Sequence, residues 1–263
     1  MTDFINYFSI LGTSVGLTYL LILTLLEIVL GIDNIIFISI ITDNLPKNQQ
    51  KKARLIGLSL ALIIRIIMLS LVSWIMTLDR EPLFSVAGHS FTAHSLVLLI
   101  GGLFLIYKSV GEMHASVKGE HQEGQSKAYG TFSAAVTQIV VVDFIFSFDS
   151  VISAIGMTND IQHETHGNPL IIIVLAVLIS MLVMMWFSGP ISRFINERPT
   201  IKMIALSFLV AIGIMLIAEA FGEHLQKGYI YFAMAFSVGV EMLNLRIRAR
   251  RSDAISLRKQ SPG

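Results

Sequence analysis

Four carboxylates interrupt apolar stretches of this sequence, and they occur as two pairs with the same spacing. Each copy has an acid, five further residues, a second acid and a small polar residue. The two copies are Glu27, Asp33 and Asn34, and Asp143, Asp149 and Ser150. An acid inside a membrane span costs about 2.5–3.5 kcal/mol on insertion scales, so these acids must be protonated, paired with a cation or in contact with water.

The side chains of both copies form a set of hard oxygen ligands. Carboxylates, an amide oxygen and a hydroxyl suit Mg²⁺, Ca²⁺ or Mn²⁺ better than copper or zinc. Four neighbouring acids cannot all carry charge without compensation, which a divalent cation supplies and protons supply less completely. The chain contains no cysteine, which excludes thiolate metal sites, iron–sulfur clusters and thiol catalysis. We therefore predict a divalent-cation site with these six residues as metal ligands.

Helical geometry limits how such a site can form. At 100° per residue, Glu27 and Asp33 lie about 120° apart on a straight helix, whereas Glu27 and Asn34 share a face. Either the helices unwind, near Gly31 in the first copy and Ser147 in the second, or only one acid of each pair binds the ion. Unwinding would also free backbone carbonyls as ligands.

Three further ionisable residues are candidates for coupling or gating. Arg65 lies deep in an apolar run and can neutralise an acid, and its counterpart in the second half is Met181. Lys108 lies near the end of a run, where its side chain can also extend to the membrane surface. Glu219 is a candidate gate or proton acceptor, or an interfacial residue.

The elements that carry these residues are long apolar runs. The chain has 263 residues, 54% apolar and only 14% charged, with a net charge of +1 and a mean hydropathy of +0.73. Runs of about 20 apolar residues indicate membrane helices. The seven predicted spans are 15–41, 55–78, 94–112, 130–157, 169–191, 201–221 and 229–246. We predict an all-α membrane protein, and we expect Gly101 and Gly102 to permit close helix packing.

The two acid pairs belong to a longer internal repeat. The segment from Glu27 reappears 116 residues later at Asp143, and LIYKSVGEMH in the third span resembles LIAEAFGEHL in the sixth. Three helices per unit is an odd number, so the second unit would enter the membrane from the opposite face, as in many secondary transporters. The predicted division is 1–112 and 130–224 for the two inverted three-helix repeats, 113–129 for a cytoplasmic linker, 225–250 for the seventh span and 251–263 for a basic tail.

Basic residues predict the orientation. Of the 19 lysines and arginines, 15 fall in the loops after spans one, three and five or in the C-terminal tail. Because basic loops stay in the cytoplasm, we expect the N-terminus outside and the C-terminus cytoplasmic. The N-terminal stretch has no basic region typical of a cleaved signal peptide.

Four segments carry a family resemblance. TLLEIVLGIDNIIFISI, VDFIFSFDSVISAIGM, KMIALSFLVAIGIMLIAE and GYIYFAMAFSVGVEMLNLR resemble the TerC family of integral membrane proteins. The resemblance covers nearly the whole chain, and its motif acids match those described above. It implies a LysE-like transporter fold in a bacterial inner membrane and efflux of Mn²⁺. The metal identity and the direction of export come from the resemblance alone.

Two functional hypotheses follow. The first is a secondary transporter that exports Mn²⁺ by alternating access, coupled to proton exchange, with Ca²⁺ and Mg²⁺ as other candidate substrates. The alternative is a non-transporting membrane factor that assists assembly or metal loading of exported proteins. We expect no enzyme activity and no organic cofactor, because no phosphate-binding loop, His-Glu-x-x-His or Gly-x-Ser-x-Gly motif occurs. We also expect no nucleic-acid partner, because helices mostly embedded in lipid offer no surface that could read a duplex. The expected partners are the cation, protons and the lipid bilayer, and a homo-oligomer is compatible with the sequence.

Overall fold

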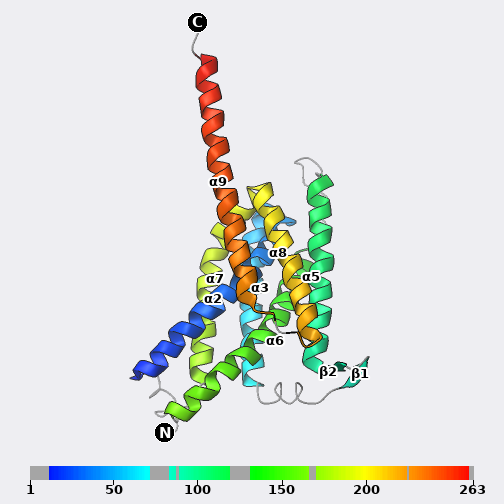
Figure 1. The fold of residues 1–263 in the computed structure, drawn as a ribbon, viewed down its shortest axis with the longest axis vertical. Helices are drawn as coiled ribbons and strands as arrows, with labels where there is room; N and C mark the ends of the chain where they lie inside the picture. The colour runs from blue at the N-terminus through cyan, green and yellow to red at the C-terminus, as the bar shows by residue number, and fades with distance from the viewer. Residues whose placement is uncertain are drawn as a thin grey trace.

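A bundle of long helices makes up the described part of the computed structural model (Figure 1). The structure describes residues 12–71, 83–86, 89–118, 131–165, 170–223 and 225–260, without the side chains of 149, 152–165 and 248–260. The helices are α2 (Ser14–Asp43), α3 (Lys47–Ser70), α5 (Ala93–Lys118), α6 (Phe132–Thr165), α7 (Leu170–Asn196), α8 (Pro199–Ala220) and α9 (Lys227–Gln260). A short antiparallel hairpin, β1 (Phe84–Val86) and β2 (His89–Phe91), precedes α5.

These seven helices correspond to the seven predicted spans, so the prediction of a seven-helix membrane protein is confirmed. Six of them are long and apolar enough to cross a membrane, and α6 contributes a shorter apolar stretch, Phe132–Phe148. The hairpin was not predicted. The helix α3 begins eight residues before its predicted span, because hydropathy marks only the apolar part and misses its first, basic turns. Similarly, α9 continues through 251–260, which belong to the predicted basic tail.

Local signals explain where the helices begin and end. Thr13 caps α2, and its side-chain oxygen accepts a hydrogen bond from the Gly16 amide at 3.0 Å. The helix ends shortly before Pro46, which disfavours helical geometry in the residue before it, and α3 starts directly after this proline. Pro199 occupies the first turn of α8, where a missing amide hydrogen costs nothing.

The helix α2 lies at the centre of the bundle. It packs most extensively on α7, while α3 packs on α6 and α5 on α8. Every residue from 33 to 42 of α2 is buried, so this stretch of the helix is covered on all its faces. The hydroxyls of Ser39 and Thr42 donate to α2 carbonyls one turn earlier, at 2.6 and 2.8 Å, so these buried polar groups are satisfied within the helix. Its acids are thus held in the interior by neighbours on several sides.

Glycines permit the backbones of α5 and α8 to approach each other closely. A Cβ added to Gly102 would lie 2.6 Å from the Gly213 carbonyl oxygen, and one added to Gly213 would lie 2.9 Å from the Gly102 carbonyl oxygen. Gly101 fits against Ile145 of α6 in the same way. The prediction that Gly101 and Gly102 permit close helix packing is confirmed by these contacts. Small residues let membrane helices approach until their backbones touch.

This contact predicts that alanine substitutions at two glycines of α5 change the stability of the protein by different amounts. Gly102→Ala should destabilise the protein by about 1–3 kcal/mol, the usual cost of overpacking. Gly111→Ala is the matched control, since nothing lies within 4 Å of an added Cβ there, and it should be neutral or stabilise by up to about 1 kcal/mol. Thermal unfolding in detergent measures both. Equal melting temperatures for the two variants would contradict the close α5–α8 contact.

Candidate cation-binding site

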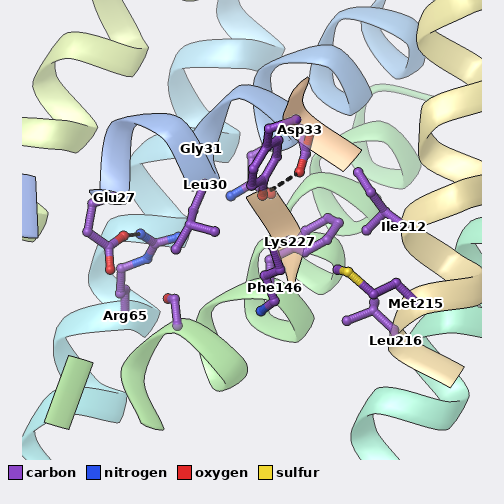
Figure 2. A pocket seen from close by; sticks show the side chains of 13 residues that line it. Glu27, Leu30, Gly31, Asp33, Arg65, Phe146, Ile212, Met215, Leu216 and Lys227 are labelled. Carbon is purple, nitrogen blue, oxygen red and sulfur yellow. Dashed lines mark hydrogen bonds and ion pairs between the residues drawn. The ribbon is translucent and has the colours of Figure 1, made fainter. Parts of the chain in front are cut away.

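A buried arginine joins one acid from each half of the chain. Arg65 of α3 contacts Glu27 of α2, with Nη1 2.7 Å from Oε2, and Asp143 of α6, with Nη2 3.1 Å from Oδ1. All three residues are at most 4% exposed, and Figure 2 shows the Arg65 guanidinium facing the Glu27 carboxylate. Such charges are stable in the interior only as a hydrogen-bonded pair or network.

Asp143 receives two more hydrogen bonds. The Asn34 side-chain amide donates to its Oδ1 at 3.1 Å, and the Ser147 hydroxyl, one turn further along α6, donates to its Oδ2 at 3.1 Å. Ser150 is buried nearby and donates to the Ser147 carbonyl at 3.3 Å. Both Asp143 oxygens therefore have donors, and this carboxylate has the least freedom to bind an ion.

Asp33 lies in a different environment from Asp143. Its Oδ2 accepts a hydrogen bond from the Tyr231 hydroxyl of α9 at 3.0 Å, marked by the dashed line in Figure 2. Among the described residues, none donates a hydrogen bond to its other oxygen, Oδ1, or to the Oδ1 of Asn34. Both side chains are at most 3% exposed. A buried acceptor without a donor is costly, so these two oxygens are the under-satisfied part of the site.

Asp33, Asn34, Glu27 and Arg65 line one small cavity of about 20 Å³, which is enough space for about one water molecule. Figure 2 shows its apolar wall, formed by Ile212, Met215 and Leu216 of α8. The remaining lining residues are Leu30, Gly31, Phe146, Ser150, Lys227 and Tyr231. The cavity therefore combines an apolar wall with polar and charged side chains, which is the usual composition of a small-ligand site.

The predicted acids do not form one cluster in the part of the chain whose side chains are described. Glu27 and Asp143 share Arg65, whereas Asp33 faces Tyr231. Within these side chains, no group of three or more Asp, Glu, His or Cys residues is arranged to hold a metal ion. The side chain of Asp149 lies outside the described set, so its role as a ligand stays a prediction.

The predicted helix break is wrong. Both α2 and α6 are continuous through Gly31 and Ser147. Gly31 instead provides room for Met184 of α7, whose sulfur occupies the space that a Cβ would take. Ser147 uses its hydroxyl to bind Asp143. The backbone carbonyls of these turns stay within the helices and do not become ligands.

The face geometry of α2 agrees with the helical-wheel analysis. Glu27 and Asn34 share a face, and both reach the network of Arg65 and Asp143. Asp33 points to another neighbour, on α9. Sequence reasoning missed Tyr231 and Lys227 as residues of this cavity; no motif links the start of α9 to Asp33, which lies 198 residues before Tyr231.

The other two candidate residues lie outside this cavity. Lys108 lines a separate cavity with Phe37, Glu112 and Gln138. Glu219 is half-buried in the last turn of α8 and is not among the residues that line the Asp33 cavity. Roles in coupling or gating for Lys108 and Glu219 stay predictions.

The fold and this site define an integral membrane protein with a polar, charged centre inside its helix bundle. The chain belongs to the TerC family, since it matches the integral membrane protein TerC family over residues 13–254.

Curated relatives support the same membership. The chain is 46% identical over 250 residues to the UPF0053 inner membrane protein YoaE of Escherichia coli strain K12, covering 90% of this chain but 46% of that protein. It is 47% identical over 230 residues to a UPF0053 protein of Haemophilus influenzae, covering 87% and 93%. It is 46% identical over 223 residues to the UPF0053 inner membrane protein YgdQ of Escherichia coli strain K12, covering 85% and 90%. The chain thus spans about half the length of YoaE. No solved structure matches it.

Proposed function

We propose that this protein is a secondary transporter for a divalent metal cation, with Mn²⁺ as the leading substrate. The observation that carries the proposal is a pair of buried oxygens at the cavity, Oδ1 of Asp33 and Oδ1 of Asn34, to which no described side chain or backbone group donates a hydrogen bond. A cation bound there would satisfy both oxygens and neutralise the Asp33 carboxylate. Polar groups buried in membrane helices are expensive and typically mark substrate or ion pathways.

The residues present fit a hard, partly hydrated cation. Carboxylate, amide and hydroxyl oxygens from Asp33, Asn34 and Ser150 are ligands that Mg²⁺, Ca²⁺ and Mn²⁺ share. Two free oxygens do not complete a coordination shell, so the ion would keep several waters, as Mg²⁺ commonly does. This donor set does not distinguish among the three ions. The choice of Mn²⁺ and of export as the direction rests on the family resemblance.

Arg65 is suited to act as a tethered counter-ion. Its guanidinium neutralises Glu27 and Asp143, which makes the substrate-free state stable without a bound metal. If Arg65 withdraws, these two carboxylates become available to the incoming cation. Carboxylates bind metal when deprotonated and release it when protonated, so proton exchange is a natural form of coupling.

Alternating access by two inverted repeats is the second part of the proposal. In the repeat, α2, α3 and α5 of the first half correspond to α6, α7 and α8 of the second half. The packed pair α2–α7 therefore corresponds to the packed pair α6–α3, and the pair α5–α8 corresponds to itself. Gly102 and Gly213, 111 residues apart and equivalent in the aligned third and sixth spans, contact each other. Glu27 and Asp143, also equivalent, bind one guanidinium. These reciprocal contacts favour a two-fold relation with the site near its axis.

Flux measurements test the transport proposal. The purified chain is reconstituted into vesicles that contain a Mn²⁺-sensitive dye, and an inward Mn²⁺ gradient is applied with and without a pH gradient. We expect protein-dependent Mn²⁺ entry. Because protons leave in exchange, the pH inside the vesicle should rise. Ca²⁺ and Mg²⁺ in parallel assays measure selectivity. Flux equal to that of empty vesicles would overturn the proposal and favour the non-transporting membrane factor.

Tyr231 yields a prediction within this mechanism. Tyr231→Phe removes the hydroxyl that bonds Asp33, so the substrate-free protein should lose about 1 kcal/mol of stability. The variant should also bind Mn²⁺ about fivefold more tightly, because Oδ2 of Asp33 loses its donor and becomes available to the cation as a further ligand. Tyr229→Phe, at a position 72% exposed, is the matched control and should change neither quantity. Weaker Mn²⁺ binding in Tyr231→Phe would instead identify the hydroxyl as a ligand.

A further inference from the structure

A second, wider cleft lies between α3 and α7, with a volume of about 970 Å³. One wall is a stripe of α3 with spacing i, i+3, i+4 and i+7, formed by Lys47, Gln50, Lys51 and Arg54. The facing wall comes from the last turns of α7 and includes Ser188, Ser192, Arg193 and Asn196. None of these residues belongs to the Asp33 cavity.

The cleft carries cations that lack acidic partners in the described part of the chain. Arg54 is half-buried, and its Nη1 donates a hydrogen bond to the hydroxyl oxygen of the buried Ser192 at 3.2 Å. Lys47, Lys51 and Arg193 form no ion pair with any described residue. Of the two acids in the cleft, Asp43 is bound to Lys202 at 2.8 Å, and Glu197 is exposed at the rim. The cleft is therefore strongly cationic, with a guanidinium at its floor.

The cleft also lies where the apolar parts of both helices end. The apolar run of α7 stops at Phe187, and that of α3 begins at Leu55, immediately after Arg54. Trp186, at the cleft, is 78% exposed, as expected for a tryptophan at the headgroup level of a membrane. A ligand in this cleft can thus place an anionic group against the cations and an apolar part against the lipid-facing side of α7.

We propose that this cleft binds the phosphodiester headgroup of an anionic phospholipid. Arg54 and Ser192 would hold phosphate oxygens at the floor, and Lys51 and Arg193 would contact the headgroup from opposite walls. Guanidinium groups bind phosphate through strong, charge-assisted hydrogen bonds, and basic pockets between membrane helices are a recurring form of lipid site. This inference is independent of the proposed transport function.

Lipid binding by the full-length purified protein tests the proposal. Native mass spectrometry follows titrations with phosphatidylglycerol and, separately, with phosphatidylcholine. We expect phosphatidylglycerol to bind at least about tenfold more tightly, and Arg54→Gln to remove roughly that factor. Lys52→Gln is the matched control: it removes the same charge from an exposed α3 residue outside the cleft and should change binding less than about twofold.

Several outcomes would overturn the proposal. Equal losses in Arg54→Gln and Lys52→Gln would indicate attraction by the general basic surface and not by the cleft. Displacement of phosphatidylglycerol by inorganic phosphate at equal concentration would indicate a site for free phosphate. If Arg54→Gln does not fold, Arg193→Gln, at an exposed position on the other wall, should still lower phosphatidylglycerol affinity more than Lys52→Gln does, and the absence of that difference would also refute it.

Discussion

Asp33→Asn should weaken cation binding strongly while leaving the protein at least as stable as the wild type. The substitution removes the charge that the cation would neutralise, and losing one charge of a buried pair costs about 2–5 kcal/mol of affinity. Mn²⁺ affinity should therefore fall by at least about 30-fold, and vesicle flux should fall to the level of empty vesicles. Stability should hold or increase because no residue in the described part of the chain donates to Asp33 Oδ1 in the wild type, and an amide is cheaper to bury than a carboxylate.

This combination separates a binding role from a structural one. Mn²⁺ affinity is measured by equilibrium dialysis and stability by thermal unfolding in the same detergent. Glu223→Gln is the control, since Glu223 is exposed after the end of α8 and its loss should change neither quantity. A variant that melts well below the wild type would indicate that Asp33 stabilises the bundle. A variant that retains flux would remove Asp33 from the substrate path.

Much of the fold was predictable from the sequence because a bilayer imposes a simple rule on long apolar runs. Segments such as 169–191 are apolar on every face, and only a helix satisfies their backbone in lipid. The ends were less predictable, since hydropathy reports contact with lipid and not helix length. The first turns of α3 carry Lys47, Lys51 and Arg54, so they lowered the hydropathy of a stretch that is nonetheless helical.

The sequence predicted several residues of the site but not the hydrogen bonds and ion pairs that they form. Acid spacing and the helical period correctly grouped Glu27 with Asn34, because a face follows from 100° per residue. Whether Arg65 would bind an acid remained open in the sequence, and it binds two. The contact of Asp33 with Tyr231 depends on how α9 is rotated against α8, which single-sequence patterns do not encode. The alternative of a helix break was wrong. A glycine that permits close packing cannot be distinguished in sequence from one that permits unwinding.

Arg65→Gln should destabilise the protein more than Gly102→Ala, Tyr231→Phe or Asp33→Asn. The guanidinium neutralises two carboxylates that are at most 4% exposed. Removing one partner from such a network leaves uncompensated buried charge and costs about 3–5 kcal/mol. Thermal unfolding in detergent measures this loss. Arg246→Gln removes the same charge from an exposed position on α9 and should change stability by less than about 0.5 kcal/mol.

The acids themselves provide the decisive controls. If the loss in Arg65→Gln comes from charge, then adding Asp143→Asn and Glu27→Gln should recover much of the stability, since a neutral hydrogen-bonded network has no buried charge to compensate. Mn²⁺ should raise the melting temperature of Arg65→Gln more than that of the wild type, because the metal can replace the missing guanidinium between the two carboxylates. If the triple variant is less stable than the single one, Arg65 acts by packing, and the tethered counter-ion has no role. If Mn²⁺ stabilises wild type and Arg65→Gln equally, the cation binds at Asp33 without entering the space between Glu27 and Asp143.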